Sequence, residues 1–300
     1  MTQTKLEDWP SASFDEAKTD LRKWREENIR RSEETVEIWE HVISRRPHSL
    51  GDEVWIVYEQ VFIAALDCAR LDIAQECLAA LYKQFPESRR VLKLQAMRLE
   101  TMNKFNEARE CYDRLIKDDE SNPIFRKRKI AILKTQGKIP EAIRELNEYL
   151  TKFMNDSEAW LELATLYLSE SDYSKAAYCV EELILAHPRD HLYYQLYAEV
   201  KYSQGGRDNL DLAKSYYSEA VKLNPENVRA LWGLFTVTSQ LAQKESGQKK
   251  KELINLISFA SDQLAKVYKK LKTNADNSFA YEKHVESIEQ LLKTAVVFDS

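Results

Sequence analysis

The chain has 300 residues, of which 44% are hydrophobic and 31% are charged, and its formal net charge at pH 7 is −5. A net negative charge argues against binding nucleic acid through bulk electrostatic attraction. The chain has only six glycines and carries no glycine-rich phosphate-binding motif, nucleophile elbow or HExxH metal motif. These features disfavour an enzyme, and we expect neither catalytic residues nor a cofactor.

The first predicted elements are one or two amphipathic helices over residues 15–45. Apolar residues such as Leu21, Trp24, Val36 and Trp39 recur at helical spacing among many charged residues. They do not follow the repeat that begins after them. We therefore interpret residues 1–54 as an N-terminal helical cap.

From residue 55 the sequence repeats with a period of 34 residues. Ala74, Ala108, Ala142 and Ala176 follow one another at this spacing, and Ala213 comes 37 residues after Ala176. Paired helices with this period are typical of the tetratricopeptide (TPR) repeat, in which a small residue lets two antiparallel helices approach closely. The sequence therefore predicts an all-α, TPR-like helical-repeat solenoid with irregular helical caps at both ends. Its five repeats are expected at residues 55–88, 89–122, 123–156, 157–190 and 191–227.

The repeats differ in how completely they carry the pattern. The unit 157–190 has the family residues at most of their positions, including Trp160, Ala176 and the helix-ending Pro188. The fifth unit contains three additional residues. We expect them in the turn over residues 204–209, because Gly205 and Gly206 supply the backbone freedom that a turn needs.

A C-terminal helical cap is predicted over residues 228–300. Its first helix is expected over residues 228–243, and a polar loop at about 243–252 follows, which contains Lys249, Lys250 and Lys251. Two further helices are expected at about 252–271 and 277–297. Irregular ends of this kind are typical of the caps of a repeat protein.

The cysteines, histidines and apolar runs predict neither a disulfide, a metal site nor a membrane span. Cys77, Cys111 and Cys179 share one repeat position, where stacked helices hold them too far apart for a disulfide. His187 and His191 have no cysteine beside them, so we expect no metal site. No apolar run approaches the roughly 18 residues of a membrane span, and no secretory signal precedes residue 10. We expect a cytosolic chain without a direct membrane span, which is compatible with docking on a membrane through integral partners.

Binding of proteins is the default function of a repeat solenoid, because it presents an extended surface. In the TPR fold the first helix of each repeat lines the concave face, and the residues at those positions form a groove with a basic middle and a more apolar C-terminal half. The candidate partner-binding residues are Arg90, Lys93, Met97, Lys127, Lys134, Leu161, Leu168 and Tyr202. Such a groove suits a peptide with acidic and apolar residues, whose carboxylates would pair with the four cations. The alternative is that these residues are ordinary solvated side chains.

Two other kinds of binding protein can be compared with the sequence. TPR co-chaperones grip the terminal carboxylate of a chaperone with conserved Lys, Arg and Asn side chains, and only Arg128 fits that clamp. The remaining clamp positions hold Glu59, Ile63, Leu94 and Ile124. A nucleic-acid-binding repeat would depend on residues 126–129 (RKRK) alone, which lie within one helix and point to several faces.

Four stretches outside the repeat positions resemble a narrower family. They are residues 22–28 (RKWREEN), 126–132 (RKRKIAI), 141–150 (EAIRELNEYL) and 198–206 (AEVKYSQGG). Together they are similar to the subunit 2 family of the endoplasmic reticulum membrane protein complex over essentially the whole chain.

That resemblance implies a non-catalytic scaffold, peripheral on the cytosolic face of the endoplasmic reticulum membrane. Its partners would be cytosolic parts of the membrane subunits and a second soluble subunit. It also implies support for inserting transmembrane segments, including tail anchors. A transient co-chaperone or adaptor is the alternative function.

Overall fold

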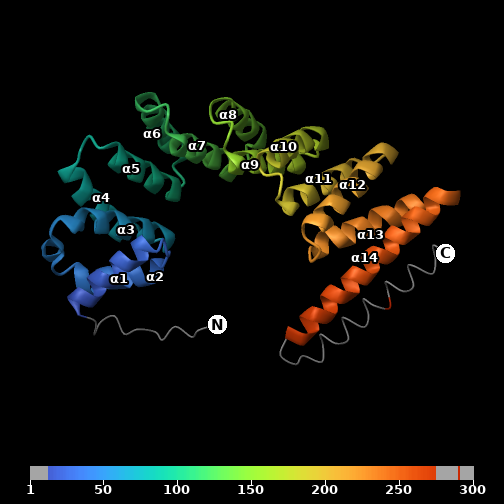
Figure 1. The fold of residues 1–300 in the computed structure, drawn as a ribbon. Helices are drawn as coiled ribbons and strands as arrows, with labels where there is room; N and C mark the ends of the chain where they lie inside the picture. The colour runs from blue at the N-terminus through green and yellow to red at the C-terminus, as the bar shows by residue number, and fades with distance from the viewer. Residues whose placement is uncertain (1–12, 275–289, 291–300) are drawn as a thin grey trace. The chain divides into compact units, whose positions relative to one another are not determined.

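The computed structural model describes residues 13–274 and residue 290, and every regular element in those residues is a helix (Figure 1). The predicted all-α repeat fold is confirmed. The chain divides into two compact units between Lys138 and Ile139. The α-helices of the first unit are α1 (Phe14–Glu26), α2 (Ser32–Ile38), α3 (Val54–Asp67), α4 (Leu71–Gln84), α5 (Arg89–Thr101), α6 (Phe105–Asp118) and α7 (Pro123–Thr135).

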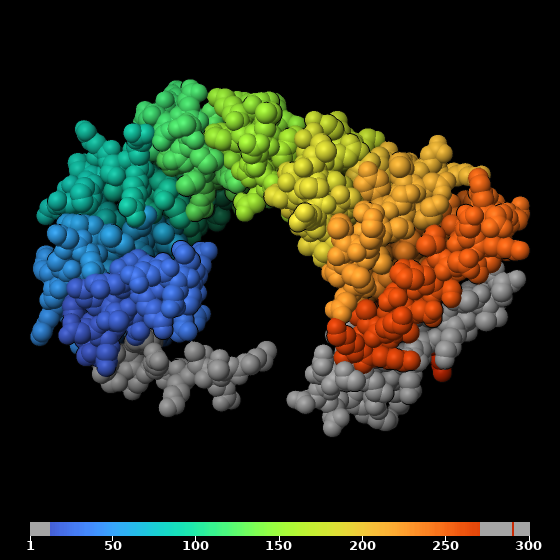
Figure 2. Space-filling model, viewed as in Figure 1, coloured from blue at the N-terminus to red at the C-terminus, as the bar shows by residue number. Residues whose placement is uncertain are grey.

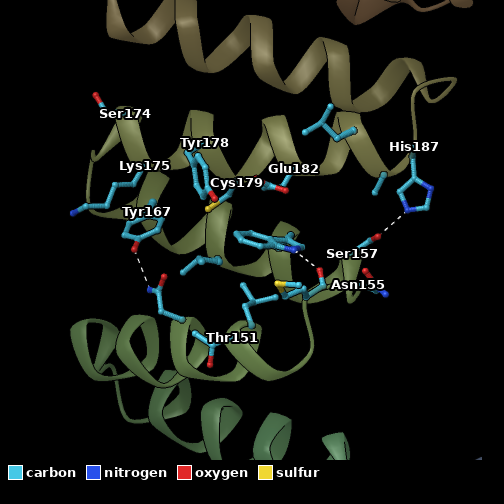
Figure 3. Close-up of a pocket in the computed structure, with 17 residues that line it drawn as sticks. Thr151, Asn155, Ser157, Tyr167, Ser174, Lys175, Tyr178, Cys179, Glu182 and His187 are labelled. Carbon is cyan, nitrogen blue, oxygen red and sulfur yellow. Dashed lines mark hydrogen bonds between the residues drawn. The ribbon is translucent and has the colours of Figure 1, made fainter.

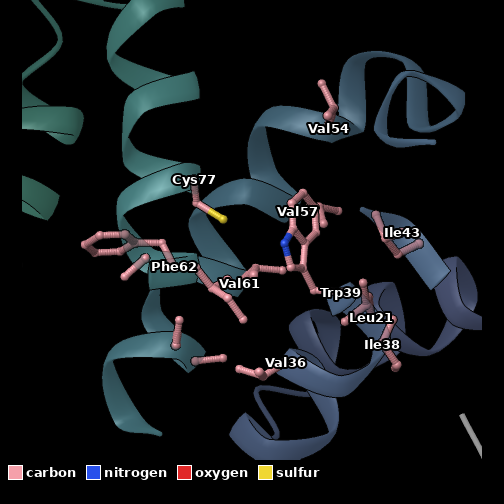
Figure 4. Close-up of a cluster of buried hydrophobic side chains, with 14 of the residues drawn as sticks. Leu21, Val36, Ile38, Trp39, Ile43, Val54, Val57, Val61, Phe62 and Cys77 are labelled. Atoms are coloured by element: carbon pink, nitrogen blue, oxygen red, sulfur yellow. The ribbon is translucent and has the colours of Figure 1, made fainter. Parts of the chain in front are cut away.

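The N-terminal helices pack on the first helix pair of the first unit. Helix α1 begins with a capping box, because the Ser13 hydroxyl accepts from the Glu16 N–H and the Glu16 carboxylate accepts from the Ser13 N–H. A π-helix (Trp39–Ile43) and a 3-10 helix (Pro47–Glu53) connect α2 to α3. Trp39 lies in the apolar core with Val57 and Val61 (Figure 4).

The first helices of successive pairs end in the same backbone conformation. Ala69, Asn103, Gly137 and Ser171 all have a positive φ, between 56° and 71°, and they lie 34 residues apart. In each case the N–H of the next residue donates to a carbonyl in the last turn, as Arg70 does to Ala65 at 2.8 Å. This arrangement is the Schellman motif, which satisfies the free carbonyl groups at the end of a helix. The repeat is therefore present in the backbone as well as in the side chains.

The second unit continues the alternation of helices. Its described helices are α8 (Ile139–Lys152), α9 (Ser157–Ser169), α10 (Tyr173–Ala186), α11 (His191–Gln204), α12 (Arg207–Leu223), α13 (Val228–Ala242) and α14 (Gly247–Asn274). Helix α14 lies along α13 (Figures 1 and 2) and buries Leu253, Ile257 and Leu264. The alanines that set the 34-residue period are 0% exposed in both units, as close helix contacts require.

The three additional residues lie within the predicted segment 204–209, but they are helical and not part of the turn. Only Gly205 and Gly206 separate α11 from α12, and α12 has 17 residues where α10 has 14. Two glycines with positive φ are sufficient for the turn. The additional residues extend the start of α12, where Leu210 is buried.

The predicted polar loop at 243–252 is also too long. The turn covers residues 243–246, and α14 begins at Gly247, so Lys249, Lys250 and Lys251 belong to the helix. Lysine is a good helix former, and the apolar spacing of α14 continues from these residues into its buried face. The helix expected at 252–271 is confirmed within α14. The one expected at 277–297 lies outside the described residues, apart from residue 290.

Candidate partner-binding surfaces

A groove of about 610 Å³ opens in the first unit and is lined by residues of α1, α3, α5 and α7 and of the segment after α1. We call it the N-terminal groove. Its apolar lining includes Ile56, Ile63, Met97 and Ile124. Such a mixture of apolar walls with a few charged groups is typical of a surface that binds a protein segment.

Positive charge dominates the lining of the N-terminal groove. Five cationic side chains line it and Glu59 is the single acidic one; the cations are Arg25, Arg30, Arg90, Lys93 and Arg128. Glu59 accepts from Arg90 Nε at 2.5 Å and lies 3.9 Å from Lys93 Nζ. The other three cations pair with acids outside the lining, Arg25 with Glu53, Arg30 with Asp67 and Arg128 with Glu100.

The structure brings together three of the predicted site residues. Arg90, Lys93 and Met97 all line the N-terminal groove, and Glu59 is an internal partner of the two cations that the sequence analysis did not foresee. Lys127 and Lys134 belong to α7 but do not line this groove.

The other three predicted residues belong to the second unit. Leu161 and Leu168 are on α9 and Tyr202 is on α11. Leu161 and Tyr202 are exposed, as is Leu192 at the start of α11.

Arg128, the residue that fits the co-chaperone clamp, is engaged within the chain. Its NH1 donates to Glu100 at 3.1 Å, and Glu100 also accepts from the Tyr112 hydroxyl. Burial raises the pKa of Glu100, although the hydrogen bonds from Tyr112 and Arg128 act in the opposite direction. The guanidinium group is therefore held against the groove wall by an internal ion pair.

The second unit has a larger cavity of about 1090 Å³, lined by residues from α8 to α10 and the segments beside them (Figure 3). Trp160 lies in its wall, where its indole N–H donates to the Met154 carbonyl at 2.8 Å. Three of its lining residues are strongly exposed: Met154 at 68%, Tyr178 at 55% and Leu185 at 76%. Exposed apolar side chains around one cavity are typical of a surface that another molecule covers.

Sequence reasoning missed the α8–α10 cavity because it considered only the first helices of the repeats. One signal was present. Met154 stands at the repeat position that holds Pro86, Pro188 and Pro225 in other units. The segment that connects α8 to α9 therefore has an apolar side chain where proline usually ends the helix.

Within residues 13–274 and 290, no group of three or more His, Cys, Asp or Glu residues could hold a metal ion. All four cysteines are free, and burial raises the pKa of the Cys179 thiol in the α8–α10 cavity to about 12. A thiol with so high a pKa is a poor nucleophile at neutral pH. In the same residues, no helix combines the length and the apolar composition that crossing a bilayer requires.

Stacked antiparallel helix pairs with a 34-residue period define the class of TPR-like helical repeat proteins. The family model for the EMC2 TPR-like repeat domain matches residues 58–209. The ER membrane protein complex subunit 2 of Xenopus tropicalis is 46% identical over 300 residues, which cover 99% of this chain and 100% of that protein. The protein of the same name from Dictyostelium discoideum is 33% identical over 267 residues, covering 85% of this chain and 83% of its own. The chain belongs to the ER membrane protein complex subunit 2 family.

Solved structures agree on the fold. The C-terminal part of a TPR repeat-containing protein from Cytophaga hutchinsonii has a TM-score of 0.55 and covers 90% of this chain and 98% of its own. Its sequence is only 14% identical, so this similarity concerns the fold alone.

Proposed function

We propose that the chain is a non-catalytic scaffold subunit of the endoplasmic reticulum membrane protein complex, at the cytosolic face of that membrane. In this function it holds cytosolic segments of the membrane subunits and contacts a second soluble subunit. It thereby supports the insertion of transmembrane segments, including tail anchors. The N-terminal groove and the second-unit residues Leu161, Leu168 and Tyr202 are the proposed contact surfaces.

The observation that carries this proposal is the family membership, which extends over essentially the whole chain. The N-terminal groove supports it with a specific chemistry. Its cationic residues stand beside Ile56, Ile63 and Met97, so it suits a segment that combines carboxylates with apolar side chains. Lys127 and Lys134 on α7 remain proposed members of the partner-binding surface.

The co-chaperone function has less support. A carboxylate clamp needs free cationic and amide groups, whereas Glu59 stands at one clamp position and pairs with Arg90. Arg128, the matching residue, already binds Glu100. A terminal carboxylate would have to compete with both internal acids.

The proposal is tested by reversing charge in the groove. In a tagged chain, Arg90→Glu with Lys93→Glu should remove most of the membrane subunits recovered by immunoprecipitation and quantitative mass spectrometry. The reason is that both substitutions place acids beside Glu59 and repel an acidic partner segment. The single substitution Lys93→Gln should have a smaller effect, because it removes one charge without reversing it.

Lys117→Glu is the matched control, since it reverses an exposed charge on α6 that does not line the groove. A thermal melt by circular dichroism shows whether each variant is folded. Undiminished recovery with a folded double variant would contradict the proposed role of the groove. Absence of the complex's subunits from the unsubstituted chain's immunoprecipitate would contradict the scaffold function itself.

A further inference from the structure

A second pocket in the first unit is separate from the N-terminal groove. Its volume is about 530 Å³, and it is lined by one face of α4 together with Gln95 and Arg98 of α5. No residue lines both this α4–α5 pocket and the groove. Any ligand of the pocket is therefore additional to the segment proposed for the groove.

The α4–α5 pocket has cations and no acid. Lys83 and Arg98 line it, and no carboxylate belongs to its lining. Within the residues that the structure describes, neither side chain forms an ion pair. This differs from the N-terminal groove, where Glu59 neutralises part of the charge. The two like charges therefore favour an anionic ligand.

Arg98 adds a second, independent observation. Its Nε is buried and has no hydrogen-bond acceptor. A buried donor without an acceptor is unfavourable, so a shift of the Arg98 side chain that brings its N–H groups to an acceptor recovers free energy. A carboxylate is well matched to this group, because the planar guanidinium can donate two parallel hydrogen bonds to its two oxygens.

The other residues that line the pocket indicate which side chain the ligand places next to its carboxylate. Tyr82 is 51% exposed, and Leu78 and Ala79 of the same helix face lie beside it in the lining. Tyrosine and arginine are the residues that most often contribute strongly to protein–protein binding. An apolar or aromatic side chain next to the carboxylate would cover the Tyr82 ring.

We infer that the α4–α5 pocket docks an acidic segment of a partner protein, with a carboxylate on Arg98 and Lys83 and an apolar side chain on Tyr82. The two cations supply charge complementarity, and the planar guanidinium group of Arg98 favours a carboxylate among the anionic groups of a protein. A protein segment fits better than a membrane surface, because the pocket combines its charge with a concave apolar wall.

The test uses the full chain and three fluorescein-labelled 18-residue amphipathic peptides. They share a leucine face with one tyrosine and differ only in the polar face, which is glutamate, glutamine or lysine. Fluorescence anisotropy should show binding of the glutamate peptide at least tenfold tighter than the glutamine peptide, with no binding of the lysine peptide. Binding should weaken as salt is raised, because the ion pairs are partly exposed.

Variants locate the site. Lys83→Glu should weaken the binding of the glutamate peptide at least tenfold. Arg98→Lys should weaken this binding several-fold, since lysine keeps the charge but loses the two parallel hydrogen bonds. Arg114→Glu on α6 is the matched control and should leave the affinity for the glutamate peptide unchanged. The groove variant Arg90→Glu with Lys93→Glu should keep the binding, and hydrogen exchange in residues 75–84 should slow when the peptide binds.

Three results would overturn this inference. The first is failure of the glutamate peptide to bind the folded chain. The second is binding that Lys83→Glu and Arg98→Lys leave unchanged, which would place the peptide elsewhere. The third is binding of phosphatidylserine vesicles through Lys83 and Arg98 without any binding of the peptide, which would make the pocket a lipid-headgroup site.

Discussion

At the scale of single residues, the ends of the first helices carry a conformational cost that depends on the residue. Ala69, Asn103, Gly137 and Ser171 occupy equivalent positions with positive φ. Glycine adopts this conformation freely and asparagine adopts it moderately well, whereas for alanine it costs roughly 1–2 kcal/mol of conformational free energy. The same Schellman motif is therefore formed at different cost in successive helix pairs.

The substitution Ala69→Gly should raise the free energy of unfolding by up to about 1 kcal/mol. The relief of the left-handed strain is partly offset by the greater freedom of glycine in the unfolded chain, about 0.4–1 kcal/mol. The measurement is the melting temperature by circular dichroism. Asn103→Gly should give a smaller gain and Gly137→Ala a loss. A lower melting temperature for Ala69→Gly would show that its methyl group makes a packing contact worth more than the strain.

At the scale of helices, the contact of α12 with α13 depends on Gly233. A Cβ atom at this position would lie 2.3 Å from ring atoms of Tyr217, and Tyr217 is itself buried. The missing side chain lets the tyrosine ring pack directly against the backbone of α13. Glycine within a helix is otherwise unfavourable by about 1 kcal/mol relative to alanine. The close packing of the Tyr217 ring offsets this cost at Gly233.

Gly233→Ala should therefore destabilise the protein, by about 1–3 kcal/mol, although helix propensity alone predicts a gain. The double variant Gly233→Ala with Tyr217→Val should recover part of the loss, because the smaller side chain makes room for the methyl group. Melting curves of the two single variants and the double variant give the coupling energy. A rise in melting temperature for Gly233→Ala alone would be incompatible with the packing described.

The sequence predicted the helices better than their connections. The alanine period correctly identified the close helix contacts, because a small buried residue is the same signal in every unit. The positive-φ positions carry Ala, Asn, Gly and Ser, so composition could not reveal that they are equivalent. The three additional residues were assigned to the turn instead of to the start of α12, because a glycine pair predicts a turn without saying how long the turn is.

The candidate site was predicted in part for a similar reason. Arg90, Lys93 and Met97 follow from the repeat register, and they do line one groove. The contribution of Trp24 and Arg25 to that groove could not be predicted, because α1 lies outside the register. Lys83 was missed because second helices such as α4 were not considered as binding elements, and Arg98 because its position on the first helix α5 is not one of those assigned to the concave face.

At the scale of the whole molecule, the chain carries exposed apolar side chains in both units. Ile56 and Ile124 belong to the first unit, and Met154, Tyr178 and Leu185 belong to the second. Exposed apolar groups of this size are normal one at a time, but their grouping around the groove and the α8–α10 cavity indicates surfaces that partners cover.

Depleting the proposed membrane partners should therefore reduce the abundance of the chain several-fold without changing its messenger RNA. Uncovered apolar surface exposes a protein to quality control and degradation. Quantitative immunoblotting after depletion measures the effect, and a proteasome inhibitor should restore the level. A chain that stays abundant after depletion would indicate a protein that functions independently of those partners.

The glycine pair before α12 has a practical consequence for protein engineering. Three additional residues already stand at this junction, and they extend the helix at its start while Ala213 and the contacts after it keep their places. Residues at the exposed start of a helix tolerate insertion when the buried face begins further along. An epitope tag or fluorescent label introduced between Gly205 and Gly206 should leave the N-terminal groove and the α8–α10 cavity undisturbed, since neither is lined by residues near this junction, which makes it a suitable place to mark the protein in living cells.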